Sequence, residues 1–315
     1  MKGRTIVLDH VNGLEAAAYL VDGVLDDLLI DDSDAPRPGA IFRAICDRPI
    51  KGQGGMMLRL PDGETAFLRQ GKGLSPGHAM LVQVTGYAED GKAVPVTDRV
   101  LFKSRYAIVT PGKPGLNISR QIDDEDVRDG LLAVAHGVYD DTFGLILRSS
   151  CAGADEAEIA DDIVAMQDMA HAVMGDAEGR EPEALTDGDG PHGLAWREWT
   201  GAADVVTEEG SFGHLGVLDQ IDHLSDPKVT LGDGTLYVEP TRAMIAVDVN
   251  TGNDTSPGAA LKANLAACRA LPRALRLRGL GGQISVDFVS MSKAHRKQVE
   301  QSLRAAFRND PIETS

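Results

Sequence analysis

The stretch AMIAVDVN, Ala243–Asn250, decides how this chain folds, together with a second stretch, QISVDFVS, at Gln283–Ser290. Both are short apolar runs rich in β-branched residues, a pattern that predicts strands. The segment between them predicts a helix. Each strand carries an aspartate, Asp248 or Asp287, near the end at which it leaves the core. We therefore expect a strand, a helix and a strand that can bring the two aspartates side by side in one sheet.

Asp248 and Asp287 are candidate ligands for a divalent cation. Ionised carboxylates that lie close together repel one another, so such a pair usually holds a cation or has one raised pKa. Either aspartate alone would more often be a cap or a turn former. Asn250 follows Asp248 by two residues and therefore points to the same side of its strand. Carboxylate and amide oxygens suit Mg²⁺, so the three residues together favour a magnesium site.

Four short motifs follow one another in this region: Ala246–Gly252 (AVDVNTG), Ala263–Ala267 (ANLAA), Leu275–Gly282 (LRLRGLGG) and Val286–Met291 (VDFVSM). Their order and spacing resemble the signature of the ribonuclease E/G family. The resemblance implies that Asp248 and Asp287 hold the catalytic Mg²⁺, with Mn²⁺ as an alternative ion, and that Asn250 supports them.

The third motif also supplies positive charge. We expect Arg276 and Arg278 to attract the RNA backbone, because phosphate contacts depend on lysine and arginine. The glycine-rich end of this motif, Gly279–Gly282, is more often a helix C-cap and turn than a phosphate loop.

Length and composition indicate a globular chain of two or three domains. It has 315 residues, of which 43% are hydrophobic, enough to bury a large core. No apolar run is long enough to span a membrane, and the N-terminus lacks the apolar region of a signal peptide. The three cysteines, Cys46, Cys151 and Cys268, lie far apart, which indicates a reducing cytoplasm and neither a disulfide framework nor a zinc knuckle.

The charge of the chain is unevenly distributed. The formal net charge of −17 argues against a generic nucleic-acid binder. Residues 121–190 contain 19 acidic and 3 basic residues, whereas residues 269–308 contain 9 basic and 2 acidic ones. The segment with the candidate metal ligands is therefore locally basic. The acidic block is more simply an aid to solubility than a partner-binding surface.

Residues 40 to about 101 predict a small barrel. Five strand-like runs are separated by turn residues: Ala40–Ile45, Gly54–Leu60, Ala66–Leu68, Ala79–Val84 and Ala93–Val96. This pattern fits an OB-fold, which commonly binds single-stranded nucleic acid by stacking bases on aromatic side chains. The resemblance implies that Phe67 and Lys92 contact RNA, with Met57 in place of a second aromatic residue. Phe67 taken alone would more often be a core residue.

Residues 102 to about 175 predict a mixed segment. Tyr106–Thr110 and Gly144–Ser150 read as strands, and Asp155–Met174 as an amphipathic helix whose packed face carries Ile159, Ile163, Met166, Ala170 and Val173. The resemblance implies a sensor for a 5′-monophosphate end in which Arg148 and Ser149 bind the phosphate. A guanidinium fork beside a hydroxyl suits that role. A lone arginine on a strand is more often solvated or in a salt bridge.

The resemblance implies a multidomain α+β and α/β architecture. Residues 1–37 begin a ribonuclease-H-like subdomain, and an OB-fold at 38–101 is inserted in it. A 5′-sensor subdomain at 102–175 follows, and then a reduced remainder of the ribonuclease-H-like part with a linker at 176–224. Within this part, the pattern of residues 175–193 predicts a mobile loop or linker. Residues 225–315 form a truncated deoxyribonuclease-I-like catalytic subdomain.

The chain ends at Ser315, before the Cys-x-x-Cys pair through which family members share zinc between subunits. We therefore expect a short family member without the zinc-linked dimer of the family.

Three functional hypotheses follow. The first is a cytoplasmic, metal-dependent endoribonuclease that hydrolyses single-stranded RNA in RNA processing or decay. The second is an RNA-binding or regulatory protein on the same scaffold that no longer cuts. The acid pair argues against it, because a binder has no need of paired acids facing an anionic ligand. A third, a metal-dependent phosphoesterase with another substrate, receives no support from the OB module.

Overall fold

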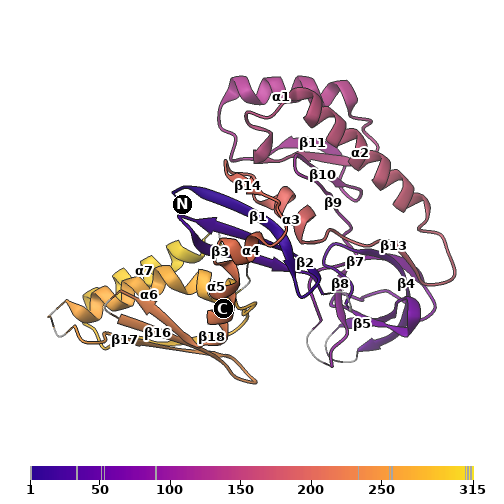
Figure 1. The fold of residues 1–315 in the computed structure, drawn as a ribbon. Helices are drawn as coiled ribbons and strands as arrows, with labels where there is room; N and C mark the ends of the chain where they lie inside the picture. Colours follow the sequence, from indigo (N-terminus) through magenta and orange to yellow (C-terminus); the bar gives the residue numbers. More distant parts are fainter. Residues whose placement is uncertain are drawn as a thin grey trace. The chain divides into compact units, whose positions relative to one another are not determined.

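The chain forms a mixed α+β structure in two compact units (Figure 1). The computed structural model describes residues 2–32, 35–50, 52, 54–88, 91–232, 234–254, 256, 258–308, 310, 312 and 314–315. Unit 1 comprises Met1–His10, Ala17–Leu28 and Ala203–Ser315, and unit 2 comprises Val11–Ala16 and Leu29–Ala202. Within these described ranges, no helix is both long and apolar enough to cross a membrane.

The N-terminal strands form a four-stranded sheet in the order β14-β1-β2-β3. Its strands are β1 (Arg4–Val11), β2 (Leu14–Val21), β3 (Val24–Ile30) and β14 (Asp204–Val206). The turn between β2 and β3 has positive φ at Asp22 (51°) and Gly23 (81°), as a type I′ hairpin requires. β14 pairs parallel with β1, so a segment far along the chain completes this sheet.

A closed five-stranded barrel lies in unit 2, consistent with an OB-fold. Its strands are β4 (Ile41–Ile50), β5 (Gly55–Arg59), β6 (Thr65–Leu68), β7 (Ala79–Val84) and β8 (Val94–Thr97), with a short 3-10 turn, η1, at Pro61–Gly63. Pairing of β4 with β7 closes the barrel around buried side chains such as Met56, Leu58 and Val82. The five strands expected from the sequence are confirmed.

The segment 175–193, expected as a mobile loop, contains regular structure. β13 (Glu183–Thr186) pairs antiparallel with β4, and α3 (Pro191–Glu198) follows. Arg43 on β4 stabilises this arrangement, because its guanidinium donates to the carbonyl oxygens of Asp176 and Glu181 and forms an ion pair with Glu183. The expectation was wrong because a polar segment with weak local preference is ordered here by distant partners.

The remaining layer of unit 2 packs two helices against a sheet (Figure 1). The sheet order is β11-β12-β10-β9, formed by β9 (Phe102–Lys103), β10 (Ala107–Thr110), β11 (Gly115–Ile118) and β12 (Gly144–Leu147). The helices are α1 (Glu125–Val138) and α2 (Glu156–Gly175), with η2 at Ser149–Cys151. The predicted packed face of α2 is confirmed: Ile159, Ile163, Ala170 and Val173 are buried, and Met166 is partly buried.

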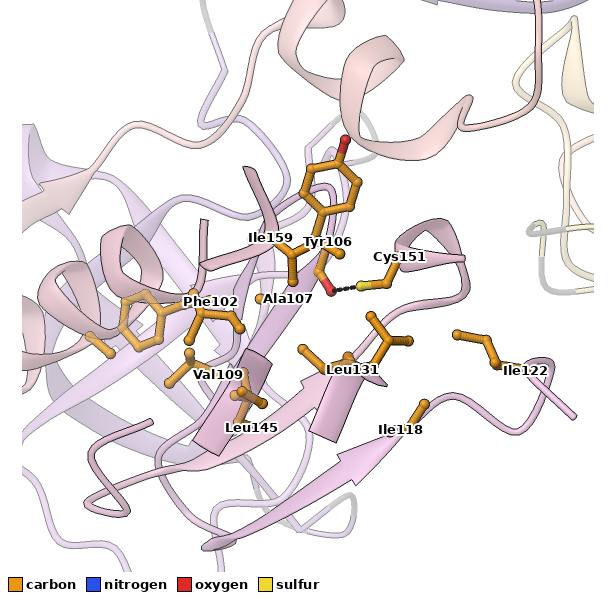
Figure 2. Close-up of a cluster of buried hydrophobic side chains, with 14 of the residues drawn as sticks. Phe102, Tyr106, Ala107, Val109, Ile118, Ile122, Leu131, Leu145, Cys151 and Ile159 are labelled. Atoms are coloured by element: carbon orange, nitrogen blue, oxygen red, sulfur yellow. Dashed lines mark hydrogen bonds between the residues drawn. The ribbon is translucent and has the colours of Figure 1, made fainter. Parts of the chain in front are cut away.

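Figure 2 shows the apolar core of this layer, in which Leu131 from α1, Leu145 from β12 and Ile159 from α2 come together. The thiol of Cys151 lies at the edge of this cluster and donates to the carbonyl oxygen of Tyr106 at 3.3 Å.

The C-terminal part of unit 1 is a four-stranded sheet in the order β15-β16-β17-β18. Its strands are β15 (Lys228–Leu231), β16 (Gly234–Pro240), β17 (Ile245–Asn250) and β18 (Ile284–Asp287). The helices of this part are α4 (Ser211–His214), α5 (Val217–Asp222), α6 (Ala259–Arg276) and α7 (Lys293–Phe307), with a short 3-10 turn, η3, at His223–Ser225. α6 connects the parallel neighbours β17 and β18, which confirms the expected strand, helix and strand.

One face of this sheet is covered and the other is polar. Leu236, Val238, Val247 and Val249 point into a core completed by α6, with side chains of α7 packed against it. The alternate residues of the same strands are exposed or partly exposed. Strand periodicity therefore sends apolar residues to the helices and leaves the polar ones on the open face.

Candidate functional site

The two predicted acids lie directly opposite one another. Asp248 on β17 and Asp287 on β18 are register partners in the parallel pair, and both side chains are exposed on the open face. Neighbouring strands are about 4.8 Å apart. The sheet therefore holds two carboxylates side by side at the same level. Val247, which is buried, and Val286, which is partly buried, pack on the other face and fix the direction in which the carboxylates point.

Asn250 orients one of the two carboxylates. It lies two residues beyond Asp248 on the same face, and its side-chain amide donates to Asp248 Oδ2 at 2.7 Å. This hydrogen bond holds the Asp248 side chain in one position and leaves the amide oxygen of Asn250 as a further possible ligand.

Asn264 on α6 holds the chain that follows Asp287. The residue is completely buried (0% exposed). Its amide nitrogen donates to the carbonyl oxygen of Val289 at 2.9 Å, and its amide oxygen accepts from the backbone N–H of Val289 at 3.0 Å. The side chain thus pairs with a peptide group as a neighbouring strand would. Asn264 belongs to the second sequence motif, ANLAA, but the motif alone did not predict this role.

The donor set fits a hard divalent cation. Mg²⁺ is usually held by one or two carboxylates together with water and substrate phosphate oxygens, so it needs no complete cage of protein ligands. Asp248 and Asp287 provide two carboxylates, and Asn250 an amide oxygen. The described residues contain no cluster of three or more His, Cys, Asp or Glu side chains that could hold a metal.

The two predicted RNA-binding arginines differ in their surroundings. Arg276 is 16% exposed and forms ion pairs with Asp26 and Asp27, each at 3.4 Å, and with Asp310. Arg278 donates to two carbonyl oxygens, those of Ala274 (3.0 Å) and Asp226 (2.9 Å). Burial lowers the pKa of the Arg278 guanidinium. Arg276 therefore has a structural role, and its contact with RNA stays a prediction, whereas the charge of Arg278 is offset only in part, by Asp226.

The predicted 5′-phosphate residues lie together at the end of β12. Arg148 forms an ion pair with Glu198 at 2.6 Å and donates to the carbonyl oxygen of Ser104, also at 2.6 Å. The adjacent Ser149 is exposed. Although partial burial tends to raise the pKa of Glu198, hydrogen bonds from Arg148 and Arg197 bring it below its ordinary value. A bound phosphate would therefore compete with Glu198 for the Arg148 guanidinium.

Phe67 and Lys92 belong to the barrel. Phe67 on β6 is partly exposed and pairs with Met57 on β5 and Pro95 on β8. A side chain at Gly55 would meet the Phe67 ring at 2.4 Å, so this glycine provides the space in which the ring lies. Lys92 is exposed in the connection that precedes β8. Both residues stay predicted RNA contacts, in unit 2, while the acid pair lies in unit 1.

Two residues beside the acid pair were missed. Tyr237 is the register partner of Asp248 on β16, and Lys228 is the partner of Tyr237 on β15. Both belong to the hairpin that β15 and β16 form. Its alternation could have shown that both share one face, but only the pairing register shows that they are level with the aspartates.

Comparisons with known proteins agree with the motifs between Ala246 and Met291. The model of the Ribonuclease E/G family matches residues 102–206 and 196–315. Ribonuclease G of Escherichia coli is 27% identical over 279 residues, which are 76% of this chain and 57% of that protein. For ribonuclease E of a Nostoc species the identity is 28% over 278 residues, covering 75% and 40%. For ribonuclease E of a Synechocystis species it is 26% over 324 residues, covering 89% and 46%. The chain thus spans about half the length of these curated relatives.

Proposed function

The chain belongs to the ribonuclease E/G family, and from this premise we propose that it is a metal-dependent endoribonuclease that cleaves single-stranded RNA. The observation that carries the proposal is the register of Asp248 and Asp287 on the open face of their sheet. Two exposed carboxylates at one level would repel an RNA phosphate unless a cation lay between them. A protein that only bound RNA would gain nothing from such a pair.

In this proposal, Asp248 and Asp287 hold Mg²⁺ or Mn²⁺ against the scissile phosphate. When bound, the ion activates water and neutralises the charge that grows on the phosphate. Asn250 keeps Asp248 in its binding position through their 2.7 Å hydrogen bond. Asn264 keeps Asp287 in place indirectly, through the peptide group of Val289.

The remaining predicted residues bind the RNA strand. Phe67 stacks on a base and Lys92 binds the backbone at the barrel. Arg278, together with Arg276, contributes positive potential. Arg148 and Ser149 bind a 5′-monophosphate once the phosphate displaces Glu198. Arg148→Ala would therefore lower the preference for 5′-monophosphorylated over 5′-hydroxyl RNA without abolishing cleavage.

The proposal is tested by cleavage of a short single-stranded RNA that carries a 5′-monophosphate. The wild-type protein is expected to cut it in Mg²⁺ or Mn²⁺ and not in EDTA. Asp248→Asn and Asp287→Asn each lower the cleavage rate by about 100-fold or more, because each removes a charged ligand. Asn250→Ala lowers it by about 10- to 100-fold, the range for residues that orient a ligand.

Glu239→Gln is the matched control, because Glu239 is an exposed acid on the neighbouring strand β16 of the same sheet. Its cleavage rate should stay within about twofold of wild type. If folded wild-type protein binds the RNA but cuts it in neither Mg²⁺ nor Mn²⁺, the enzyme proposal fails and the RNA-binding alternative replaces it. Equal loss in Glu239→Gln would also count against a specific role for the aspartates.

A further inference from the structure

Four side chains form one row across the open face of the C-terminal sheet. Lys228 pairs with Tyr237, Tyr237 with Asp248, and Asp248 with Asp287, one residue from each of the four strands. Because neighbouring strands are about 4.8 Å apart, the backbone at Lys228 lies about 10 Å from that at Asp248. The row therefore runs perpendicular to the strands, with acids at one end and a cation at the other.

Lys228 and Tyr237 are available to a ligand. The part of the chain that the structure describes offers no hydrogen bond or ion pair to the Lys228 ammonium or to the Tyr237 hydroxyl. Lys228 is exposed, and Tyr237 is partly exposed. The nearby Arg276, in contrast, is engaged by three carboxylates. Among the described residues, Lys228 forms no ion pair with Asp248, which lies two strands away, so the acid pair does not account for its charge.

The Lys228 end of the row borders a basic cleft. The cleft has a volume of about 460 Å³ and is lined by Lys228, Arg273 and Arg278, among others. The Arg273 guanidinium donates to the carbonyl oxygen of Leu25 at 2.6 Å, and Arg278 donates to carbonyl oxygens as well. These hydrogen bonds position the guanidinium groups, which also interact electrostatically with Asp26 and Asp226. Together with Lys228, the two arginines leave this end of the sheet basic, as an anion would require.

We propose that Tyr237 and Lys228 form the subsite for the nucleotide next to the cleaved bond, so that the RNA strand crosses the sheet perpendicular to its β-strands. Tyr237 stacks on the base of this nucleotide, and Lys228 binds its phosphate. This inference rests on the proposed ribonuclease function, which places the scissile phosphate at Asp248 and Asp287. A polynucleotide is the ligand that presents a phosphate, a base and a second phosphate in succession along such a row.

Binding without cleavage gives the first test. The affinity of wild type and variants for a short single-stranded RNA is measured in EDTA by fluorescence anisotropy, over a range of salt concentrations. Lys228→Gln weakens binding and reduces the slope of log affinity against log salt by about 0.7, the value for one phosphate contact on a single strand. Tyr237→Ala weakens binding by about 5- to 100-fold, and Tyr237→Phe retains most of the affinity because the ring is kept.

Lys297→Gln is the control for loss of one positive charge. Lys297 is exposed on α7, which packs with α6 on the covered side of the sheet. It should leave the slope unchanged. If Lys297→Gln changes the slope as much as Lys228→Gln does, the effect is one of net charge and the subsite is overturned.

An abasic RNA locates the stacked base. RNAs that lack the base on one or the other side of the cleaved bond are compared with the intact RNA, for wild type and Tyr237→Ala. The penalty of Tyr237→Ala disappears for one of the two abasic RNAs, as expected when the base and the ring contact each other. A penalty that is the same for all three RNAs overturns the assignment.

The two proposals fail separately. If wild-type protein never cuts RNA but Lys228→Gln and Tyr237→Ala lose affinity as described, the ribonuclease proposal fails and a binding row remains. If the wild type cuts RNA and both variants keep wild-type affinity and KM, the proposed subsite is overturned, whereas the proposed metal site at Asp248 and Asp287 is retained.

Discussion

At the scale of single residues, the C-terminal sheet and its helices depend on polar side chains that pair with the backbone. Asn264 is the clearest example, because a buried amide side chain takes both hydrogen bonds of the Val289 peptide group. A hydrophobic residue of similar size could fill the volume but would leave a backbone donor and acceptor unpaired. The ANLAA motif therefore has a physical reason for its asparagine.

Asn264→Leu is expected to lower the free energy of unfolding by about 2–4 kcal/mol, because two buried backbone groups lose their partners. Asn264→Asp keeps the acceptor for the Val289 N–H but places a buried carboxylate oxygen against the Val289 carbonyl oxygen, so its stability should fall at least as much. Urea unfolding followed by circular dichroism measures the first effect. Arg269→Ala, at an exposed position of the same helix, is the control and should stay within about 0.5 kcal/mol of wild type.

Arg276 illustrates a residue whose environment could not be predicted locally. Its partners Asp26 and Asp27 lie some 250 positions earlier in the chain, and Asp310 lies after it. From the sequence, Arg276 was predicted to attract the RNA backbone, because these three acids are remote in sequence and their ion pairs with it could not be seen. Its predicted contact with RNA stays a prediction, and its ion pairs make it a stabilising residue of unit 1 in any case.

At the scale of elements, strand β12 can pair with both of its neighbours only because its first residue, Gly144, has no side chain. Gly144 opens β12, which pairs with β10 on one side and β11 on the other. A Cβ atom at this position would lie 1.8 Å from the carbonyl oxygen of Lys113 and 2.2 Å from Thr110 Oγ1. Neither the loop before β11 nor β10 can move away without breaking the sheet.

Gly144→Ala is expected to lower the free energy of unfolding by more than about 2 kcal/mol, because backbone must shift to admit the methyl group. Gly130→Ala in α1 is the matched comparison. It adds the same methyl group in open space within a helix, and should raise stability by about 0.5–1 kcal/mol. Equal effects of the two substitutions in thermal unfolding would contradict this account of β12.

At the scale of the whole molecule, the chain passes between the two units several times. Its three cysteines lie in three different buried regions. Cys46 lies in the barrel, Cys151 in the core under α1 and α2, and Cys268 on α6 against α7. All three are free and buried. Burial raises the pKa of Cys151 to about 11 and that of Cys268 to about 11.

The native protein at pH 8 is therefore expected to react with a thiol reagent such as DTNB only when it opens locally, whereas urea-unfolded protein releases three equivalents at once. Between pH 9 and about 11, the unfolded chain loses thiol protons that the folded chain retains. Stability should accordingly fall across this range, and less so in Cys151→Ala. A rapidly reacting thiol in the native protein would contradict the burial of these residues.

Much of the fold could be read from local pattern. The five barrel strands, the packed face of α2 and the strand, helix and strand around Asp248 and Asp287 follow from apolar periodicity, which depends only on neighbouring residues. The acid pair and Asn250 were also recognisable, because they lie at the ends of such runs and within short motifs. The same pattern indicated a small barrel, but only the structure shows that β4 and β7 are the strands that close it.

The sequence by itself determined which residues can carry the chemistry and which face of each strand they occupy, because residue type and strand alternation are local properties. Only the tertiary structure decided the pairing register that puts Asp248 opposite Asp287 and extends the row to Tyr237 and Lys228. It also decided that β13 joins the barrel and that Arg276 meets Asp26 and Asp27. Register and remote ion pairs result from packing between segments far apart in the chain, and such packing leaves no pattern in any short stretch of sequence.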